Sequence, residues 1–237
     1  MHAQFDAALA HAPVLAAKTT DWDTVLPKIG PAVTETLQMV LVTMVLAGIF
    51  GLIIGTLLYT TRSGSILANR PVNALLNFVV NLIRPIPFVI LLAALSPVML
   101  QTIGTSIGIR AGIFAMVVAA TFAISRIVEQ NLVSIDPGVI EAARAMGASK
   151  LRIMFSVMLP EALGPLILGY TFIVIGVVDM SAMAGAVGGG GIGDFAIRYG
   201  YQRFDWNVTL VAIIIIVILV QLVQLVGNLL ARKIMRR

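Results

Sequence analysis

The chain has 237 residues and a net charge of +5, with 59% hydrophobic and only 11% charged residues, against roughly a quarter charged in an average soluble domain. So few charges cannot cover a water-soluble surface, which indicates a membrane protein. The absence of cysteine and the position of both histidines among the first eleven residues exclude structural disulfides and a cysteine or histidine metal site, and the dispersed basic residues exclude a nucleic-acid patch.

The first predicted element is an amino-terminal extension, residues 1–32. It is rich in alanine and has no basic start before its short apolar stretch, so a mature surface tail is favoured over a cleaved signal peptide. A first membrane span is predicted from Val33 to Tyr59, because residues 36–61 carry no charge and exceed the about 20 helical residues that cross a hydrocarbon core.

Four more apolar segments follow. A helical pattern from Val72 to Arg84 is interrupted by Pro85 and Pro87 and resumes to Leu100, and the sequence leaves open whether residues 72–83 lie in the membrane or on its surface. The other spans are predicted at residues 112–128, 161–183 and 208–230. Because these runs are continuous rather than alternating, the fold class is all-α, a polytopic membrane protein with about five transmembrane helices, and a barrel is excluded.

The basic residues predict the orientation of the chain. Five spans place the two termini on opposite sides of the membrane. A cytoplasmic carboxyl end puts ten basic residues inside and five outside, with Arg84 unassigned, and the positive-inside rule favours this arrangement. We therefore expect the amino end outside and the carboxyl end in the cytoplasm.

The segment between the third and fourth spans predicts two short helices on the cytoplasmic side. Pro137 and Gly138 break the chain, Gly147 can end the first helix in a left-handed conformation, and Pro160 suits the first turn of the fourth span. One face of the first helix follows helical spacing, with Glu141 and Arg144 off it: Val139, Ala142, Ala143 and Met146. A small apolar face could enter a groove of a soluble partner, or it could belong to a plain surface helix.

The sequence of this segment resembles the EAA loop of binding-protein-dependent ABC importer permeases. The family often has Ile at the position of Val157. The residues that match the motif are Glu141, Ala142, Ala143, Gly147, Leu159 and Pro160. The resemblance implies that residues 139–158 dock on a separate ATP-hydrolysing subunit. It also implies a type-1 transmembrane domain over residues 33–224, followed by the end of the last helix and a basic tail, residues 225–237.

Other segments resemble the permeases of methionine importers: NLIRPIPFVILL, residues 104–108 and SAMAGAVGGGGIGDFAIRYGY. The resemblance implies a homodimer in the bacterial inner membrane, with two ATP-binding subunits and a periplasmic lipid-anchored methionine-binding protein. It implies import of methionine, with both enantiomers as expected substrates. No cofactor is expected on this chain, because ATP and Mg would be used by the partner subunit.

Other functions account for less of the sequence. A permease for another small solute, such as glycine betaine, stays open because the EAA loop does not depend on the substrate. A secondary transporter or channel would explain the hydropathy but not the EAA spacing, and no acid–base or metal constellation suggests an enzyme. The glycine cluster after Met183 lacks the Lys-Ser or Lys-Thr of a P-loop, so it is interpreted as a compact external loop.

A few residues near membrane depth are candidates for the translocation path. Arg84 and Asp179 are costly in hydrocarbon, so we expect them to pair with each other, although an interfacial position or a substrate contact would also account for them. Met183, next to Ser181 and other small residues, could meet its copy at a two-fold axis and close a dry gate, or it could be ordinary packing.

Overall fold

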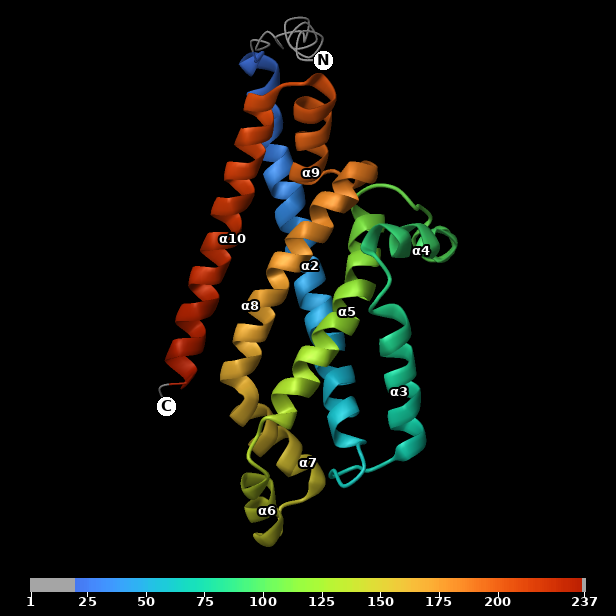
Figure 1. The fold of residues 1–237 in the computed structure, drawn as a ribbon, viewed down its shortest axis with the longest axis vertical. Helices are drawn as coiled ribbons and strands as arrows, with labels where there is room; N and C mark the ends of the chain where they lie inside the picture. The colour runs from blue at the N-terminus through green and yellow to red at the C-terminus, as the bar shows by residue number, and fades with distance from the viewer. Residues whose placement is uncertain (1–19, 236–237) are drawn as a thin grey trace, which may run out of the picture.

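The structure, a computed structural model, describes residues 20–235, and all regular elements in this range are helical. Figure 1 shows an elongated bundle with its long helices running side by side. Four helical runs are long and apolar enough to cross a bilayer: α2 (Trp22–Thr60), α5 (Ile109–Val133), the run Lys150–Gly189 that contains α8 (Leu159–Ala184), and α10 (Trp206–Met235). The predicted all-α membrane fold is confirmed.

The first helix begins earlier than the sequence predicts, at Trp22 rather than Val33. Asp21 caps it by accepting hydrogen bonds from the N–H and hydroxyl of Thr24, and these bonds lower the pKa of the Asp21 carboxyl. The helix continues through Pro27 and Pro31. Val25 and Ala32 of this helix are buried in a small cluster at this end of the bundle, together with residues of α9 (Gly191–Phe195) and α10: Ile192, Phe195, Val208 and Ala212. Residues 1–19 of the predicted extension lie outside the described range.

The second predicted span is broken. α3 (Arg70–Ile83) and α4 (Phe88–Ile103) are each too short to cross a membrane, and only together are they long and apolar enough. The chain bends by 111° between them. Pro85 and Pro87 cause the break, since each lacks an N–H and restricts the residue before it. Asn69 caps the start of α3 through the N–H of Val72, and Arg84 is the residue at its carboxyl end.

The centre of the bundle is the contact between α2 and α5. Glycines on α2 allow it: a Cβ at Gly51 would lie 2.5 Å from Ile124 Cγ2, and one at Gly55 would lie 2.5 Å from the carbonyl oxygen of Ser125. The backbones of α2 and α5 therefore approach each other closely, as small residues in membrane helices permit. The main apolar core extends from this contact to α8.

The connections alternate between the two ends of the bundle, as Figure 1 shows. One end carries α6 (Pro137–Ala145) and α7 (Lys150–Ile153). The other end carries a helical hairpin made of η2 (Gly185–Gly189), α9 (Gly191–Phe195), η3 (Ala196–Gly200) and η4 (Tyr201–Arg203). If the bent pair counts as one pass, the described chain runs along the bundle five times, in agreement with the prediction.

Candidate functional site

The first short helix, α6, is closed at both ends by local hydrogen bonds. At its start the side chain of Asp136 accepts from the N–H of Gly138, at 2.8 Å. At its end Gly147 adopts a φ of +78°, its N–H donates to Arg144, and the N–H of Ala148 donates to the carbonyl of Ala143. This is the Schellman arrangement, so the predicted role of Gly147 in ending the helix is confirmed.

The predicted apolar face of α6 is divided between the core and the outside. Ala143 is buried with Ile140 against the rest of the chain. Val139, Ala142 and Met146 are exposed, and the side chain of Met146 is 81% accessible. Ala143 therefore holds the helix in place, and its three neighbours form the outer face. Glu141 and Arg144 flank it, both exposed, and line a hollow of about 290 Å³ below the end of α2.

The next segment extends the outer face. Ser149 caps α7, which passes through the π-helical turn η1 (Met154–Met158) directly into α8. Ile153 and Met158 are buried, whereas Leu151 and Phe155 are 62% and 60% exposed. We use the name elbow surface for the exposed apolar residues of this end: Val139, Ala142, Met146, Leu151 and Phe155. Large apolar side chains that remain this exposed on a short helical projection are typical of an interaction site.

The last part of the predicted loop motif lies in the continuous helix. Leu159 is half-buried and begins α8, and Pro160 occupies its first turn, as predicted. Pro160 has no N–H to donate to the preceding turn, and the wider π-helical turn η1 immediately before it accommodates the change in register.

A polar seam between α3 and α5 was not predicted. Asn77 and Asn81 accept hydrogen bonds from Arg126 Nη2, at 2.8 and 2.7 Å, while Arg126 Nη1 forms an ion pair with Glu129. Asn73 donates to the carbonyl oxygen of Leu58, which ties α3 to α2 as well. The side chains of Arg126 and Glu129 are only 15% and 13% exposed. A charged pair that is this enclosed requires such polar partners.

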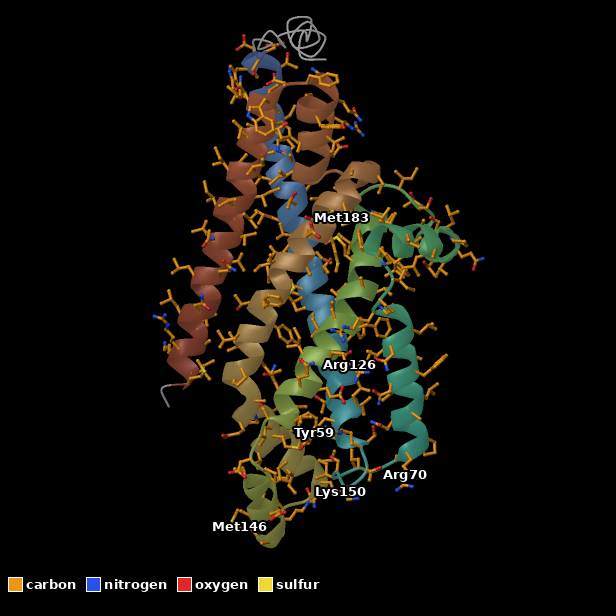
Figure 2. All side chains as sticks on the ribbon, viewed as in Figure 1. Tyr59, Arg70, Arg126, Met146, Lys150 and Met183 are labelled. Carbon is orange, nitrogen blue, oxygen red and sulfur yellow. The ribbon has the colours of Figure 1, made fainter. Side chains whose placement is uncertain are left out.

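The signal for this seam is present in the sequence. Asn69, Asn73, Asn77 and Asn81 recur at every fourth position and so form a polar line along one face of α3. A hollow of about 570 Å³ lies beside the seam, and Arg62 and Arg84 also line it. Figure 2 shows Arg126 on α5 within the bundle, on the side toward α3.

The ion pair expected between Arg84 and Asp179 is absent. Within residues 20–235 the ion pairs are Arg126–Glu129 and Arg198–Asp194, and both Arg84 and Asp179 are exposed. The reason lies in the packing: α3, which ends at Arg84, contacts α2 and α5, whereas Asp179 belongs to α8. The enclosed ion pair of the described chain is instead formed by Arg126 and Glu129.

The residues expected at a gate lie at the end of α8. Met183 is half-buried and packs against the main core. Ser181 is buried, and its hydroxyl donates to the carbonyl of Val178 at 2.6 Å. Figure 2 shows Met183 near the hairpin end and Met146 at the opposite end of the molecule.

The glycine cluster after Met183 is a compact, partly buried turn at the end of α8. Gly188, Gly190 and Gly191 all have positive φ, so the chain reverses here into α9. Glu35 of α2 accepts from the N–H of Gly191 at 2.7 Å, and Thr36 Oγ1 accepts from the next N–H, of Ile192, at 2.8 Å. The turn is thereby fixed to the first helix, and sequence reasoning missed Glu35 and Thr36 because their partners are 156 positions away.

Comparison with known proteins identifies the kind of molecule. Residues 60–236 match the family described as binding-protein-dependent transport system inner membrane component. The chain is 39% identical to the probable D-methionine transport system permease protein MetI of Vibrio cholerae over 86% of this chain and 90% of that protein. It is also 39% identical to the methionine import system permease protein MetP of Bacillus subtilis, over 76% of this chain and 82% of that one.

Solved structures agree with the sequence relatives. A chain of the MetNI methionine ABC transporter in an inward-facing conformation superposes with a TM-score of 0.86 at 40% identity, covering 89% of this chain and 98% of that one. An amino acid ABC transporter crystallised with histidines has a TM-score of 0.74 at 19% identity and shares the fold. This chain therefore belongs to the family of binding-protein-dependent transport system inner membrane components, the permease subunits of ABC importers.

Proposed function

We propose that this chain is the permease subunit of an ATP-driven importer of methionine. The observation that carries the proposal is its similarity, at 39–40% identity over most of both chains, to permeases of methionine transport systems and to the MetNI structure. Import of both enantiomers is part of the proposal, because relatives are described both as D-methionine and as methionine permeases. The chain would reside in the bacterial inner membrane with its amino end outside.

The chain depends on other subunits for energy and for substrate delivery in this proposal. It acts as a homodimer, two ATP-binding subunits hydrolyse ATP with Mg, and a lipid-anchored periplasmic protein supplies methionine. ATP hydrolysis falls to the partner subunits in this proposal, because the sequence of this chain contains no P-loop motif. The elbow surface supports a docking role, because it combines exposed apolar side chains with the charges of Glu141 and Arg144 at one end of the bundle.

The proposed gate is Met183 at the end of α8. Small residues beside it allow two copies of the helix to approach, and two thioether side chains could then close a dry constriction. Arg84 and Asp179, both exposed in a single chain, are proposed to face the path. Trimming Met183 to Ala should produce a leak of small solutes in proteoliposomes with subunit assembly intact. A loss of folded yield without a leak would assign Met183 to packing instead.

A reconstituted system tests the function directly. The chain is purified with its ATP-binding and methionine-binding partners, placed in liposomes, and assayed for uptake of labelled methionine. We expect uptake that requires ATP and ceases with a partner unable to hydrolyse it. Uptake of glycine betaine in place of methionine would overturn the substrate, and uptake driven by an ion gradient without ATP would overturn the class of transporter.

A further inference from the structure

An apolar hollow of about 770 Å³ runs along the side of the bundle formed by α2, α8 and α10. α8 packs against both of the other helices and forms the floor, as its position between them in Figure 1 suggests. The hydroxyls of Tyr170 and Thr171, which line the hollow, donate to the carbonyls of Gly48 and Ile167, each at 2.7 Å. The remaining lining is aliphatic or glycine, so the hollow offers no free polar side chain to water or to a polar solute.

Two close contacts hold α10 against α8, the floor of the hollow. A Cβ at Gly227 of α10 would lie 2.1 Å from Thr171 Oγ1, and one at Gly164 of α8 would lie 2.4 Å from Met235 Cγ. α10 is therefore held tightly against α8 at two points along its length.

The surroundings of the hollow are hydrocarbon. The most apolar 18-residue stretch of α10 has a mean hydropathy of 3.0, and only 6% of this stretch is buried within the chain. Leu222, Val226 and Leu230 line the hollow and remain more than half exposed. In a membrane helix such residues face lipid tails, and a hollow among them is filled most readily by an acyl chain.

The charges at one end of the hollow match a phospholipid head group. Lys233 follows Val226 and Leu230 at helical spacing, so it continues the lining face of α10 beyond its apolar part, and Arg232 is next to it. Both are exposed, and within residues 20–235 neither forms an ion pair. The acidic residue in the first turn of α8, Glu161, leaves these two helix ends with a net positive charge.

We propose that this hollow binds one acyl chain of an anionic phospholipid, whose head group is held by Lys233 and Arg232. The tail fills the space between α2 and α10, and the phosphate forms charge-assisted hydrogen bonds with the two cations. The bound lipid joins α10 to α2 along the hollow, whereas near their amino-terminal ends the two helices already share an apolar cluster. The proposal does not depend on which solute the permease carries.

Native mass spectrometry of the purified full-length chain tests the proposal, with phosphatidylglycerol and phosphatidylethanolamine of identical acyl chains as probes. We expect saturable retention of one phosphatidylglycerol and weaker retention of phosphatidylethanolamine. Val226→Trp should weaken phosphatidylglycerol binding about tenfold, because excluding even two methylenes is worth that much. Leu225→Trp is the matched control: residue 225 is equally exposed at the same depth but does not line the hollow, and it should bind as the unmodified chain does.

Further variants separate tail from head group. Val45→Phe narrows the hollow from the α2 side and should reduce binding even if Val226→Trp fails to fold. Lys233→Gln with Arg232→Gln should abolish the preference for phosphatidylglycerol while lipid is still retained. Equal binding by Val226→Trp and Leu225→Trp would overturn the proposal. So would efficient disulfide formation between two copies of Val226→Cys in native membranes, since a second copy would then cover the hollow; the chain has no other cysteine.

Discussion

Individual residues at the elbow show how the backbone conformation shapes the proposed docking surface. Gly147 has a φ of +78°, and nothing lies within 4 Å of where its Cβ would be. Its constraint is therefore conformational and not steric. Any residue with a Cβ is strained at this angle, and proline would in addition remove the N–H that donates to Arg144.

Substitution of Gly147 should uncouple transport without preventing insertion. Gly147→Ala is expected to destabilise the helix end by about 1 kcal/mol, Gly147→Pro by more, and Gly147→Asn by less, because Asn tolerates the left-handed region. ATP-driven uptake should be lowest for Gly147→Pro, intermediate for Gly147→Ala and highest for Gly147→Asn, while the amount of inserted protein stays constant. Gly30→Ala is the control, since Gly30 is helical with open space around it and should lose nothing. Full uptake by Gly147→Pro would remove this residue from the coupling path.

The Arg126–Glu129 pair should contribute more to stability than the other ion pair of the described chain. Arg126→Gln leaves the enclosed Glu129 and the half-buried Asn77 with fewer hydrogen bonds, which should cost about 1–3 kcal/mol. Arg198→Gln is the comparison, because the side chain of Arg198 is 61% exposed and such pairs contribute about 0–1 kcal/mol. Thermal unfolding in detergent measures both. Adding Glu129→Gln to Arg126→Gln should recover part of the loss; no recovery would show that the two residues act separately.

The packing of α2 on α5 depends on glycines, which have no side chains. Gly55→Ala would place a Cβ against the carbonyl oxygen of Ser125 and the side chain of Val128, both at 2.5 Å. Since backbone cannot move aside cheaply, we expect a loss of about 1–3 kcal/mol. Gly30→Ala on the same helix meets nothing within 4 Å and again provides the control. Equal unfolding midpoints for the two variants would contradict the close approach.

The sequence predicted these elements where hydropathy decides them and missed them where distant contacts do. The cores of α2, α5, α8 and α10 follow from runs without charge, and the break at Pro85 and Pro87 follows from proline chemistry. The start of α2 at Trp22 does not, because it depends on packing against Phe195 and Val208. The same holds at the site: helical spacing placed Ala143 and Met146 on one face, but the neighbouring helices decide that Ala143 is buried and Met146 exposed.

The whole molecule has its short helices α6 and α7 at one end and the glycine hairpin at the other, and the orientation of these ends is a prediction. Cysteine replacement can test it, because the chain has none of its own. Cysteine at Ser149, next to α7, should be protected from a membrane-impermeant thiol reagent in intact cells. Cysteine at Arg198, in the hairpin, should react. Both positions are accessible in the single chain, so the reverse pattern would mean that the orientation is inverted.

One feature of the fourth pass has a mechanical consequence. From Lys150 to Ala184 the chain stays helical without a break, through α7, η1 and α8, although α7 lies at an angle to α8 (Figure 1). The elbow surface is therefore joined directly to α8, which from Leu159 to Met183 is about 36 Å long at 1.5 Å of rise per residue. A tilt of α8 by about 5°, caused by the proposed docking of an ATPase, would displace its far end by about 3 Å over that length. A continuous helix needs no relay of intermediate contacts to transmit such a motion.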